Sequence, residues 1–422
     1  MRRFIGVVAA AALACFGGSG ASSAERVAGL WLFTYGPDRP TTVTALDPTT
    51  LAALRTPLRL GPAYPAHGPD GAFTAMWTEP RRGTAALLLV DLRRLRVAGR
   101  VPVPARLAGT PHLRWLTPTL AFAVEKDEVF ALDFTTRSAR RVARLPARLD
   151  LLAPLAASPE ALVALLPPKV EFSSPGRAVR LAVVTRSGRL RIVTLARMIN
   201  VTFGVLPTKG CAKGDGAFVA RHPALAVNRA KNVAYVVGID RIAELDLGTA
   251  RVSYHRIGTG GRGRWRGWTR AATVLTDGRL ALAGADTRRA RDNDCGNSLS
   301  TEERNLVLVD TRTWHEQVHP ARGSALVLGR EIVEDGDGRV SVFTLDGRKR
   351  FTLRFGPGFP DRFVSGGGDR LYVVKHVTPL RSRDPLRSEV WVVDRRTGRE
   401  LTRVRVGGTL GSVENATYLQ PY

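Results

Sequence analysis

The chain has 422 residues, of which 44% are hydrophobic, and its 63 lysines and arginines against 37 aspartates and glutamates give a formal net charge of +26 at pH 7. After residue 24, a proline or a charge interrupts every apolar run before it reaches 18 residues, so no transmembrane segment is expected. The positive charge would attract anionic polymers and lipid headgroups. The arginines are spread along the whole chain without one dense patch, however, so nucleic acid is not an expected partner.

The first 24 residues have the three-part layout of a secretory signal peptide. Two arginines precede an apolar run that ends at Phe16, and small, polar residues follow as far as Ala24. The sequence therefore predicts removal of residues 1–24 and one extracytoplasmic domain over residues 25–422, which is secreted, periplasmic or at the cell surface. Alternatively, the segment before Cys15 resembles the end of a lipoprotein signal, with Cys15 as the site of a lipid anchor.

A short sequence motif recurs along the rest of the chain: an apolar β-branched run, an aspartate, a polar turn, and a second run rich in Val, Leu and Arg. Five copies keep the spacing Asp-x-x-Thr, at Asp47/Thr50, Asp133/Thr136, Asp246/Thr249, Asp310/Thr313 and Asp394/Thr397. Weaker copies lie at Asp91, Thr185 and Asp346. Neighbouring copies are 36 to 64 residues apart, a period of the size that four-stranded propeller blades use.

The recurring aspartate is interpreted as a turn residue rather than a catalytic one. An Asp that ends a strand accepts hydrogen bonds from the N–H groups just ahead of it, and the Thr hydroxyl closes the same turn. A further strand pair precedes each of these hairpins, as at residues 161–166 and 280–283, so that each unit reads as one blade of four strands.

The pattern resembles the Tyr-Val-Thr-Asn-type and WD40-like β-propeller repeats over nearly the whole mature chain, although the Gly-His and Trp-Asp pairs of WD40 proteins are missing. The resemblance implies an all-β propeller and no particular activity. We expect eight blades, or seven if the unit around Asp346 is not a full blade. Residues 30–60 supply about three strands, and the tail at residues 412–419 can supply the fourth, so that both ends of the chain share one blade and close the ring.

Three motifs that suggest chemistry are interpreted as chance matches. His315 to His319 reads H-E-x-x-H, but on an outer strand the two histidines would lie about 13 Å apart, too far to share one zinc ion. Gly258 to Gly263 reads G-x-G-x-x-G without the helix and the acidic residue of a dinucleotide site. Glu334 to Gly338 lacks the ligand spacing of a calcium loop. No metal or cofactor is therefore expected.

The longest irregular segments all fall where a propeller joins its second and third strands, or one blade to the next, and these connections share one face. They are residues 167–176, 203–221, 258–270, 286–304 and 376–388. Cys211 and Cys295 lie in two of them and are expected to form a disulfide, worth about 2 to 4 kcal/mol. The candidate ligand-binding residues on this face are Lys209, Lys213, His222, Arg262, Arg264, Trp265, Arg288, Asp292, Asp294 and His376.

The sequence favours a non-catalytic protein that binds a protein, a glycan or an anionic envelope component on this loop-rich face. The alternative is a propeller enzyme of the lactonase, lyase or dehydrogenase kind, with a metal or cofactor at the central channel. That alternative requires Asp, Glu, Asn or His to cluster on the innermost strands, and these are mainly apolar.

Overall fold

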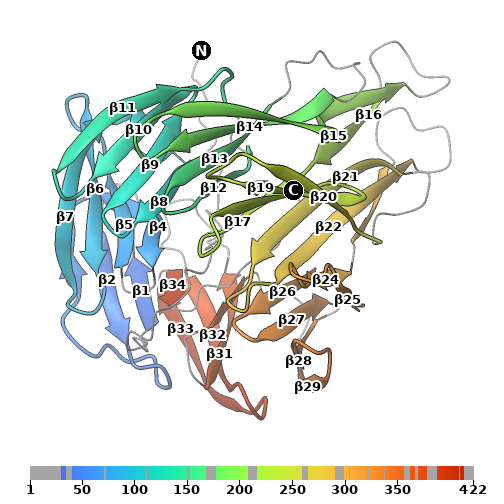
Figure 1. The fold of residues 1–422 in the computed structure, drawn as a ribbon. Helices are drawn as coiled ribbons and strands as arrows, with labels where there is room; N and C mark the ends of the chain where they lie inside the picture. The colour runs from blue at the N-terminus through green and yellow to red at the C-terminus, as the bar shows by residue number, and fades with distance from the viewer. Residues whose placement is uncertain are drawn as a thin grey trace.

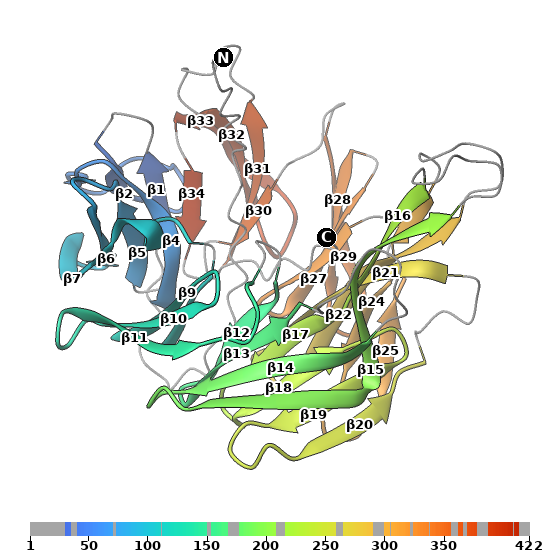
Figure 2. The ribbon, with the colours of Figure 1, turned by 90° about the horizontal axis from the view of Figure 1, so that it is seen from above.

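The computed structural model describes residues 30–34, 40–70, 73–110, 112–149, 153–167, 177–207, 216–258, 265–289, 299–303, 305–320, 324–336, 338–355, 362–365, 369–377, 387–407 and 409–412. These residues form 34 strands and a single short 3-10 helix, η1 (Ala105–Leu107). Thirty-two of the strands form eight antiparallel blades of four strands arranged around a ring, which confirms the predicted eight-bladed β-propeller (Figures 1 and 2).

The blades follow one another in chain order, and each has an innermost strand, two middle strands and an outer strand. In that order, the first four blades contain β34 (Thr409–Ser412), β1 (Leu30–Thr34), β2 (Thr42–Leu46) and β3 (Leu58–Arg59); β4 (Ala63–Asp70), β5 (Phe73–Thr78), β6 (Thr84–Asp91) and β7 (Arg96–Pro104); β8 (Leu113–Thr117), β9 (Leu120–Glu125), β10 (Glu128–Asp133) and β11 (Ser138–Arg144); and β12 (Leu155–Ala157), β13 (Ala161–Leu166), β14 (Arg177–Thr185) and β15 (Leu190–Pro207).

The remaining four blades contain β17 (Ala224–Asn228), β18 (Val233–Val237), β19 (Arg241–Asp246) and β20 (Val252–Arg256); β21 (Trp265–Val274), β22 (Leu280–Arg289), β24 (Leu306–Val309) and β25 (Glu316–His319); β26 (Ser324–Leu328), β27 (Glu331–Gly336), β28 (Arg339–Thr344) and β29 (Lys349–Arg354); and β30 (Arg362–Ser365), β31 (Arg370–Val377), β32 (Arg387–Asp394) and β33 (Glu400–Gly407). Two strands, β16 (Gly216–His222) and β23 (Leu299–Glu303), lie outside the four-stranded blades.

Both ends of the chain share the first blade, as the sequence predicts. The C-terminal strand β34 pairs with β1 in a register that places Leu30 opposite Ser412 and Phe33 opposite Thr409. The two strands, blue and red, lie side by side in both views (Figures 1 and 2). The closing strand therefore comprises residues 409–412 and overlaps the expected segment 412–419 only at its first residue; residues 413–419 lie outside the described part of the chain.

The middle strands are apolar because a blade packs on both of its faces. In β13 every residue is buried: Ala161, Val163 and Leu165 belong to the core shared with the fifth blade, while Leu162 and Leu166 belong to the core shared with the third. Successive residues of a strand point to opposite faces, so a strand buried between two neighbouring blades reads as a continuous hydrophobic run.

The predicted Asp turns all join the third strand of a blade to its outer strand. Asp47 Oδ1 accepts hydrogen bonds from the backbone N–H groups of Thr50 (2.7 Å) and Thr49 (2.9 Å). Asp394 accepts them in the same way from Thr397 (2.8 Å) and Arg396 (3.0 Å). These hydrogen bonds lower the pKa of both carboxyl groups. The structural interpretation of the repeated aspartates is therefore confirmed.

Two blades use threonine in place of aspartate at this position. The Oγ1 atoms of Thr185 and Thr344 each accept the backbone N–H of the arginine four residues later, at 3.1 Å. Gly188 (φ 91°) and Gly347 (φ 86°) then take the left-handed conformation. The weaker copy expected at Asp346 is therefore centred on Thr344, and its unit is a complete blade rather than a partial one.

Each turn between the third and outer strands also contacts the blade before it. The Trp31 indole N–H donates to the Leu92 carbonyl (3.2 Å), Gln317 Nε2 donates to the Leu345 carbonyl (2.9 Å), and the Tyr372 hydroxyl donates to the Pro48 carbonyl (2.7 Å), which joins the last blade to the first. At the boundary between the second and third blades, the Phe134 ring packs directly over Gly99, where an added Cβ would lie 2.8 Å from the ring. The turns therefore connect neighbouring blades as well as strands.

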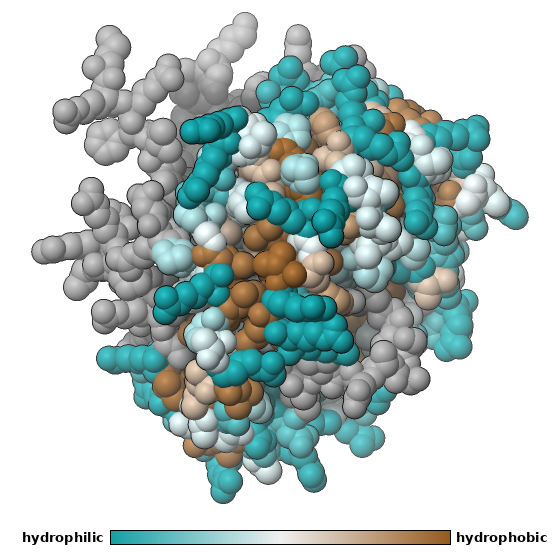
Figure 3. Space-filling model, turned by 90° about the vertical axis from the view of Figure 1, so that its left-hand side faces the viewer, coloured by the Kyte–Doolittle hydropathy of each residue, from teal (hydrophilic) through white to brown (hydrophobic). Residues whose placement is uncertain are grey.

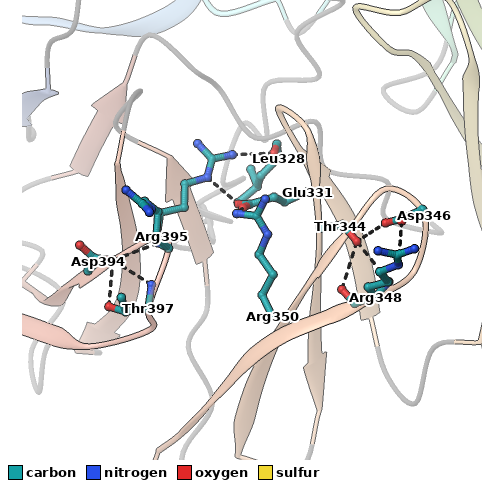
Figure 4. Close-up of polar contacts among 10 residues, drawn as sticks. Leu328, Glu331, Thr344, Asp346, Arg348, Arg350, Asp394, Arg395 and Thr397 are labelled. Carbon is teal, nitrogen blue, oxygen red and sulfur yellow. Dashed lines mark hydrogen bonds and ion pairs between the residues drawn. The ribbon is translucent and has the colours of Figure 1, made fainter.

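Between the seventh and eighth blades this connection is ionic (Figure 4). Glu331 of β27 is buried, and it accepts hydrogen bonds from Arg350 (2.6 Å) on the outer strand of its own blade and from Arg395 (2.5 Å) in the turn of the next. Arg395 also donates to the Leu328 carbonyl at 2.8 Å. One carboxylate thus holds two arginines from neighbouring blades.

Candidate functional site

The long connections gather on one face, as predicted. Because strands alternate in direction, the connections between second and third strands leave the blade on the same side as those between successive blades. Residues 168–176, 290–298 and 378–386 join second to third strands, while 208–215 and 259–264 belong to connections between blades. The turns that carry Asp47 and its equivalents lie on the opposite side. By topology these connections leave the ring on one side, but much of what the sequence predicts to be irregular there is strand, at residues 203–207, 216–221, 265–270, 286–289 and 299–303.

On this face the ends of β15, β21 and β22 extend beyond their blades and pair with β16 and β23, and we call the part of the sheet formed in this way the projecting sheet. Its strand order is β15, β16, β21, β22 and β23, and it comprises residues 201–207, 216–222, 265–270, 284–289 and 299–303. Its centre is a short parallel pairing, in which Arg221 and His222 of β16 lie opposite Trp268 and Thr269 of β21. β15 comes from the fourth blade, β21 and β22 from the sixth, and β16 leads into the fifth (Figure 1).

Three of the predicted ligand-binding residues come together on the projecting sheet. Trp265 of β21 lies directly opposite Arg288 of β22, and His222 lies on the neighbouring strand opposite Thr269. His376 is in the eighth blade, where it lies opposite Ser388, away from the other three along the ring. The remaining candidates lie outside the described residues, and so do both cysteines; they are Lys209, Lys213, Arg262, Arg264, Asp292, Asp294, Cys211 and Cys295.

The two cysteine-containing segments belong to hairpins of the projecting sheet. Residues 208–215 connect β15 to β16, and residues 290–298 connect β22 to β23. Both β15 and β22 run toward the loop-rich face, so both connections begin at the same end of the sheet. A disulfide between them stays a prediction.

The H-E-x-x-H segment lies on a strand, as expected, and its side chains have other contacts. Glu316 accepts the backbone N–H of Gly258 at 2.6 Å. His319 is buried, packs edge-on against the Phe343 ring, and has its Nε2 atom 3.7 Å from Glu334 Oε2. Burial lowers the pKa of His319, and the Glu334 carboxylate opposes that shift. The segment therefore belongs to the packing between the sixth and seventh blades.

The structure describes the other two motifs in part. Glu334, Asp335 and Gly336 end β27 and pair with β28, with Glu334 opposite Ser341 and Gly336 opposite Arg339. The G-x-G-x-x-G segment opens onto the strand β21 and not onto a helix. Its residues 259–264 lie outside the described part of the chain.

The innermost strands offer few groups for metal or acid–base chemistry. Of the Asp, Glu, Asn and His residues that such an enzyme would need, the eight innermost strands contain His67 and Asp70 of β4 and Asn228 of β17. Among the described residues, no group of three or more His, Cys, Asp or Glu side chains is placed to hold a metal ion.

An arginine braces the ring on the side opposite to the loop-rich face. Arg229, in the turn between β17 and β18, donates hydrogen bonds to the carbonyl oxygens of Trp115 (2.7 Å), Leu116 (2.6 Å) and Ala157 (3.1 Å). These acceptors belong to the third and fourth blades, so one side chain connects three blades. Burial lowers the pKa of Arg229. Nothing in the sequence around Arg229 distinguishes it from the other arginines.

A histidine that the sequence analysis did not single out, His255, lies at the boundary between the fifth and sixth blades. The His255 ring stacks on the Trp314 indole with 3.4 Å between their centroids, and its Nε2 atom lies 3.1 Å from Glu244 Oε2. Trp314 follows Asp310 in the turn and takes the left-handed conformation (φ 59°). The stack therefore ties the turn of the sixth blade to the outer strand of the fifth.

The comparisons with known proteins agree on the fold. The chain is similar to the apo form of AztD from Citrobacter koseri, with a TM-score of 0.53 and 12% sequence identity over 91% of this chain and 97% of that one. It is also similar to the dihydro-heme d1 dehydrogenase NirN in complex with DHE, with a TM-score of 0.52 and 14% identity over 95% of this chain and 78% of that one. No protein-family model and no curated protein sequence matches the chain. Identity this low supports the propeller fold alone.

No helix within the described residues has the length and apolarity that crossing a membrane requires.

Proposed function

We propose that this chain is an exported, non-catalytic propeller that binds a protein or glycan partner on its loop-rich face, with the projecting sheet as the binding platform. The observation that carries the proposal is the parallel pairing of β16 with β21, which joins extensions of the fourth and sixth blades into one sheet. A rigid ring that carries extra structure on one face is the usual arrangement of binding proteins.

The composition of the projecting sheet supports recognition of a partner. Its strands place Trp265 directly opposite Arg288, with His222 opposite Thr269 four residues further along β21, and Trp and Arg are among the residue types most enriched at binding hot spots. We propose that a disulfide between Cys211 and Cys295 connects its two hairpins. Peptide mass spectrometry without reduction should recover the two cysteines in one cross-linked peptide, and free thiols at both positions would refute the disulfide.

The outer part of the β15–β16 hairpin, which forms one edge of the binding platform, can be removed without cutting into a blade. Phe203 and Ala220 are opposite each other in the register of β15 and β16, so an Asn-Gly turn joining them directly replaces the outer part of the hairpin. A matched variant shortens the hairpin of the eighth blade, which lies on the same face, by joining His376 to Ser388 through the same turn, so that His376 and Glu389 are kept. Both variants should keep the thermal midpoint of the propeller, because neither changes a residue of the buried core of a blade beyond its end.

Binding is measured first by passing envelope proteins and, separately, purified cell-wall glycans over the immobilised protein, and then by calorimetry with the retained component after purification. Stoichiometric binding that is lost with the shortened β15–β16 hairpin, and kept with the shortened β31–β32 hairpin, supports the proposal. Equal binding by all three proteins contradicts it. Stoichiometric metal in the purified protein together with hydrolytic or redox turnover would instead establish the channel enzyme.

A further inference from the structure

The propeller gathers arginines that are far apart in the sequence onto part of its circumference. In the second to fourth blades, residues 91–100, 133–148 and 185–197 contain the turns that lead into the outer strands β7, β11 and β15, together with all or part of each strand. Twelve arginines in these three segments are exposed: Arg93, Arg94, Arg96, Arg100, Arg137, Arg140, Arg141, Arg144, Arg148, Arg186, Arg189 and Arg197. The same segments contain only two carboxylates, Asp91 and Asp133. We call this surface the arginine arc.

The carboxylates of the arginine arc are already engaged. Asp91 accepts the backbone N–H groups of residues 93 and 94 at 3.0 and 3.1 Å, and Asp133 accepts those of residues 135 and 136 at 2.8 and 3.3 Å. The neighbouring Asp127 and Glu128 hold Arg144 and Arg141, each at 2.7 Å. Among the described residues, no carboxylate lies within 4.0 Å of the other exposed arginines Arg96, Arg100, Arg137, Arg140, Arg186 and Arg189.

Protection of exposed strand edges does not account for this concentration. Arginines on an outer strand do hinder edge-to-edge association, and that need is equal in every blade. In the fifth and sixth blades, however, the corresponding segments expose only Arg251, Arg256 and Arg312. In the seventh and eighth blades, which are also rich in arginine, Glu331 and Glu389 neutralise the side chains of Arg350, Arg395, Arg403 and Arg405. The arginine arc places twelve exposed arginines on three consecutive blades, and several of them have no carboxylate nearby among the described residues.

The surroundings of the arginine arc indicate what kind of anion it fits. Figure 3 faces the side where β7 and β11 lie, and long hydrophilic side chains flank an apolar strip there. The large apolar side chains exposed in the three segments are Val97 and Ile192, and the described part of these segments exposes no aromatic ring. Single-stranded nucleic acid is normally bound by stacking on aromatic rings, and membrane surfaces by insertion of large apolar groups. Ile199, two residues beyond the third segment on β15, is also exposed, so apolar groups lie beside the arginines, but charge dominates and the arginine arc favours a ligand recognised chiefly by its charge.

Curvature selects further among charged polymers. The three outer strands follow the convex circumference of the ring (Figure 2), so a stiff, straight polyanion can touch only part of the arc at one time. A flexible chain can bend around the rim and contact all three blades. We propose that the arginine arc binds a flexible linear polyanion that carries a phosphate or carboxylate on each repeat unit. The arginine arc adjoins the projecting sheet along β15 but uses residues 185–197 of that region rather than 201–207, so the inference does not depend on the proposed function.

Inorganic polyphosphate is a suitable probe because it is flexible and carries charge without rings or apolar groups. The test variant replaces one arginine in each blade of the arc, Arg96→Gln, Arg140→Gln and Arg189→Gln. The matched control removes the same three charges from the fifth and sixth blades, Arg251→Gln, Arg256→Gln and Arg312→Gln. All six side chains are exposed, so both proteins should fold, and near-UV circular dichroism checks that they do.

Affinity is measured by calorimetry over a range of salt concentrations, with short and long polyphosphate. We expect long chains to bind more tightly than short ones at equal phosphate concentration. The arc variant should lose at least tenfold in affinity at low salt, and the slope of log K against log salt should become shallower by about two. The control variant should stay within about twofold of the unmodified protein.

Three results would overturn the proposal. Equal losses in the arc and control variants would mean that only the net charge of the protein attracts the polymer. Duplex DNA binding as tightly as polyphosphate at equal phosphate concentration would remove the argument from curvature. Vesicles of phosphatidylglycerol that bind in an arc-dependent manner, where polyphosphate does not, would show that the surface docks on a membrane instead.

Discussion

Replacing Glu331 with glutamine should destabilise the protein more than replacing a carboxylate of any exposed or half-exposed ion pair in the described part of the ring. The loss should arise at the boundary between the seventh and eighth blades. The change keeps the size and shape of the side chain but removes its charge. It leaves the guanidinium groups of Arg350 and Arg395 beside a neutral amide, at positions where the Glu331 oxygens lie 2.6 and 2.5 Å from them. Figure 4 shows both arginines pointing at this one carboxylate.

The expected loss follows from burial. The side chains of Glu331 and Arg395 are only 4% and 11% exposed. Removing one partner of a buried ion pair generally costs about 3 to 5 kcal/mol. We expect about 3 kcal/mol, the lower end, because Arg395 keeps its hydrogen bond to the Leu328 carbonyl and the Arg350 side chain is 39% exposed to water. For a chain of this size, that corresponds to a decrease in Tm of about 3 to 4 °C.

Differential scanning calorimetry measures this decrease, and Arg350→Gln is the control. The control removes the more exposed arginine while Glu331 keeps Arg395, so its loss should be about 1 kcal/mol or less. A Glu331→Gln protein within about 0.5 kcal/mol of the unmodified chain would refute the reasoning. So would equal losses in the two variants, because the burial of the Arg395 contact would then have no effect.

Three further predictions concern the turns and the brace. Gly398→Ala and Gly83→Ala both place a side chain at a left-handed position, with φ 74° and 80°. They differ in their surroundings: a Cβ at Gly398 would lie 2.6 Å from the Phe351 ring of the preceding blade, whereas a Cβ at Gly83 would meet open space. Urea denaturation should therefore show about 1 kcal/mol lost at Gly83 and at least about twice that at Gly398; equal losses would contradict the packing of the turn on its neighbour. Arg229→Lys should lower the free energy of unfolding by about 2 to 4 kcal/mol in the same assay, because an ammonium group cannot reach the carbonyl oxygens of Trp115, Leu116 and Ala157 together as the planar guanidinium does. Near-normal stability would mean that only the positive charge matters at this position. Backbone N–H groups lower the pKa values of Asp47, Asp246, Asp310 and Asp394 below the value of about 3.9 in an unfolded chain. Their contribution is therefore complete above about pH 4 and is lost as the pH falls through the lowered values, so Tm should decrease over that range, and replacement of all four by asparagine should flatten the decrease.

The sequence allowed prediction of the features that depend on local contacts. An Asp turn is formed by residues within three positions of one another, as the hydrogen bonds from Asp47 to Thr49 and Thr50 show, so its pattern is legible without the rest of the chain. The short threonine turns have an equally local signature, Thr-x-x-Gly, at Thr185 and Thr344, which would have placed the seventh blade correctly.

The features that escaped prediction depend on how distant segments meet. The parallel pairing of Arg221 with Trp268 joins strands from two blades, and no turn residue records it. The basic residues also look evenly spread in the sequence because each outer strand carries only a few of them. The ring brings Arg96, Arg140 and Arg189 to one side of the molecule. Arginines that are evenly spread along the chain can therefore still form a dense patch on the folded surface.

The shared first blade has a consequence for how the protein reaches its folded form. β1 cannot pair on its inner side until β34 has been synthesised. Roughly 380 residues separate the two strands, and closing a loop of that length costs about 5 kcal/mol in chain entropy. During synthesis, which proceeds from the N-terminus, the backbone N–H and C=O groups on the inner edge of β1 therefore stay unpaired until β34 is available. The seven other blades can assemble in sequence beforehand, and the edge is covered only after β34 has been made. Folding of this ring should accordingly be a two-phase process, with fast assembly of blades and a slow, late closure that short C-terminal truncations would abolish.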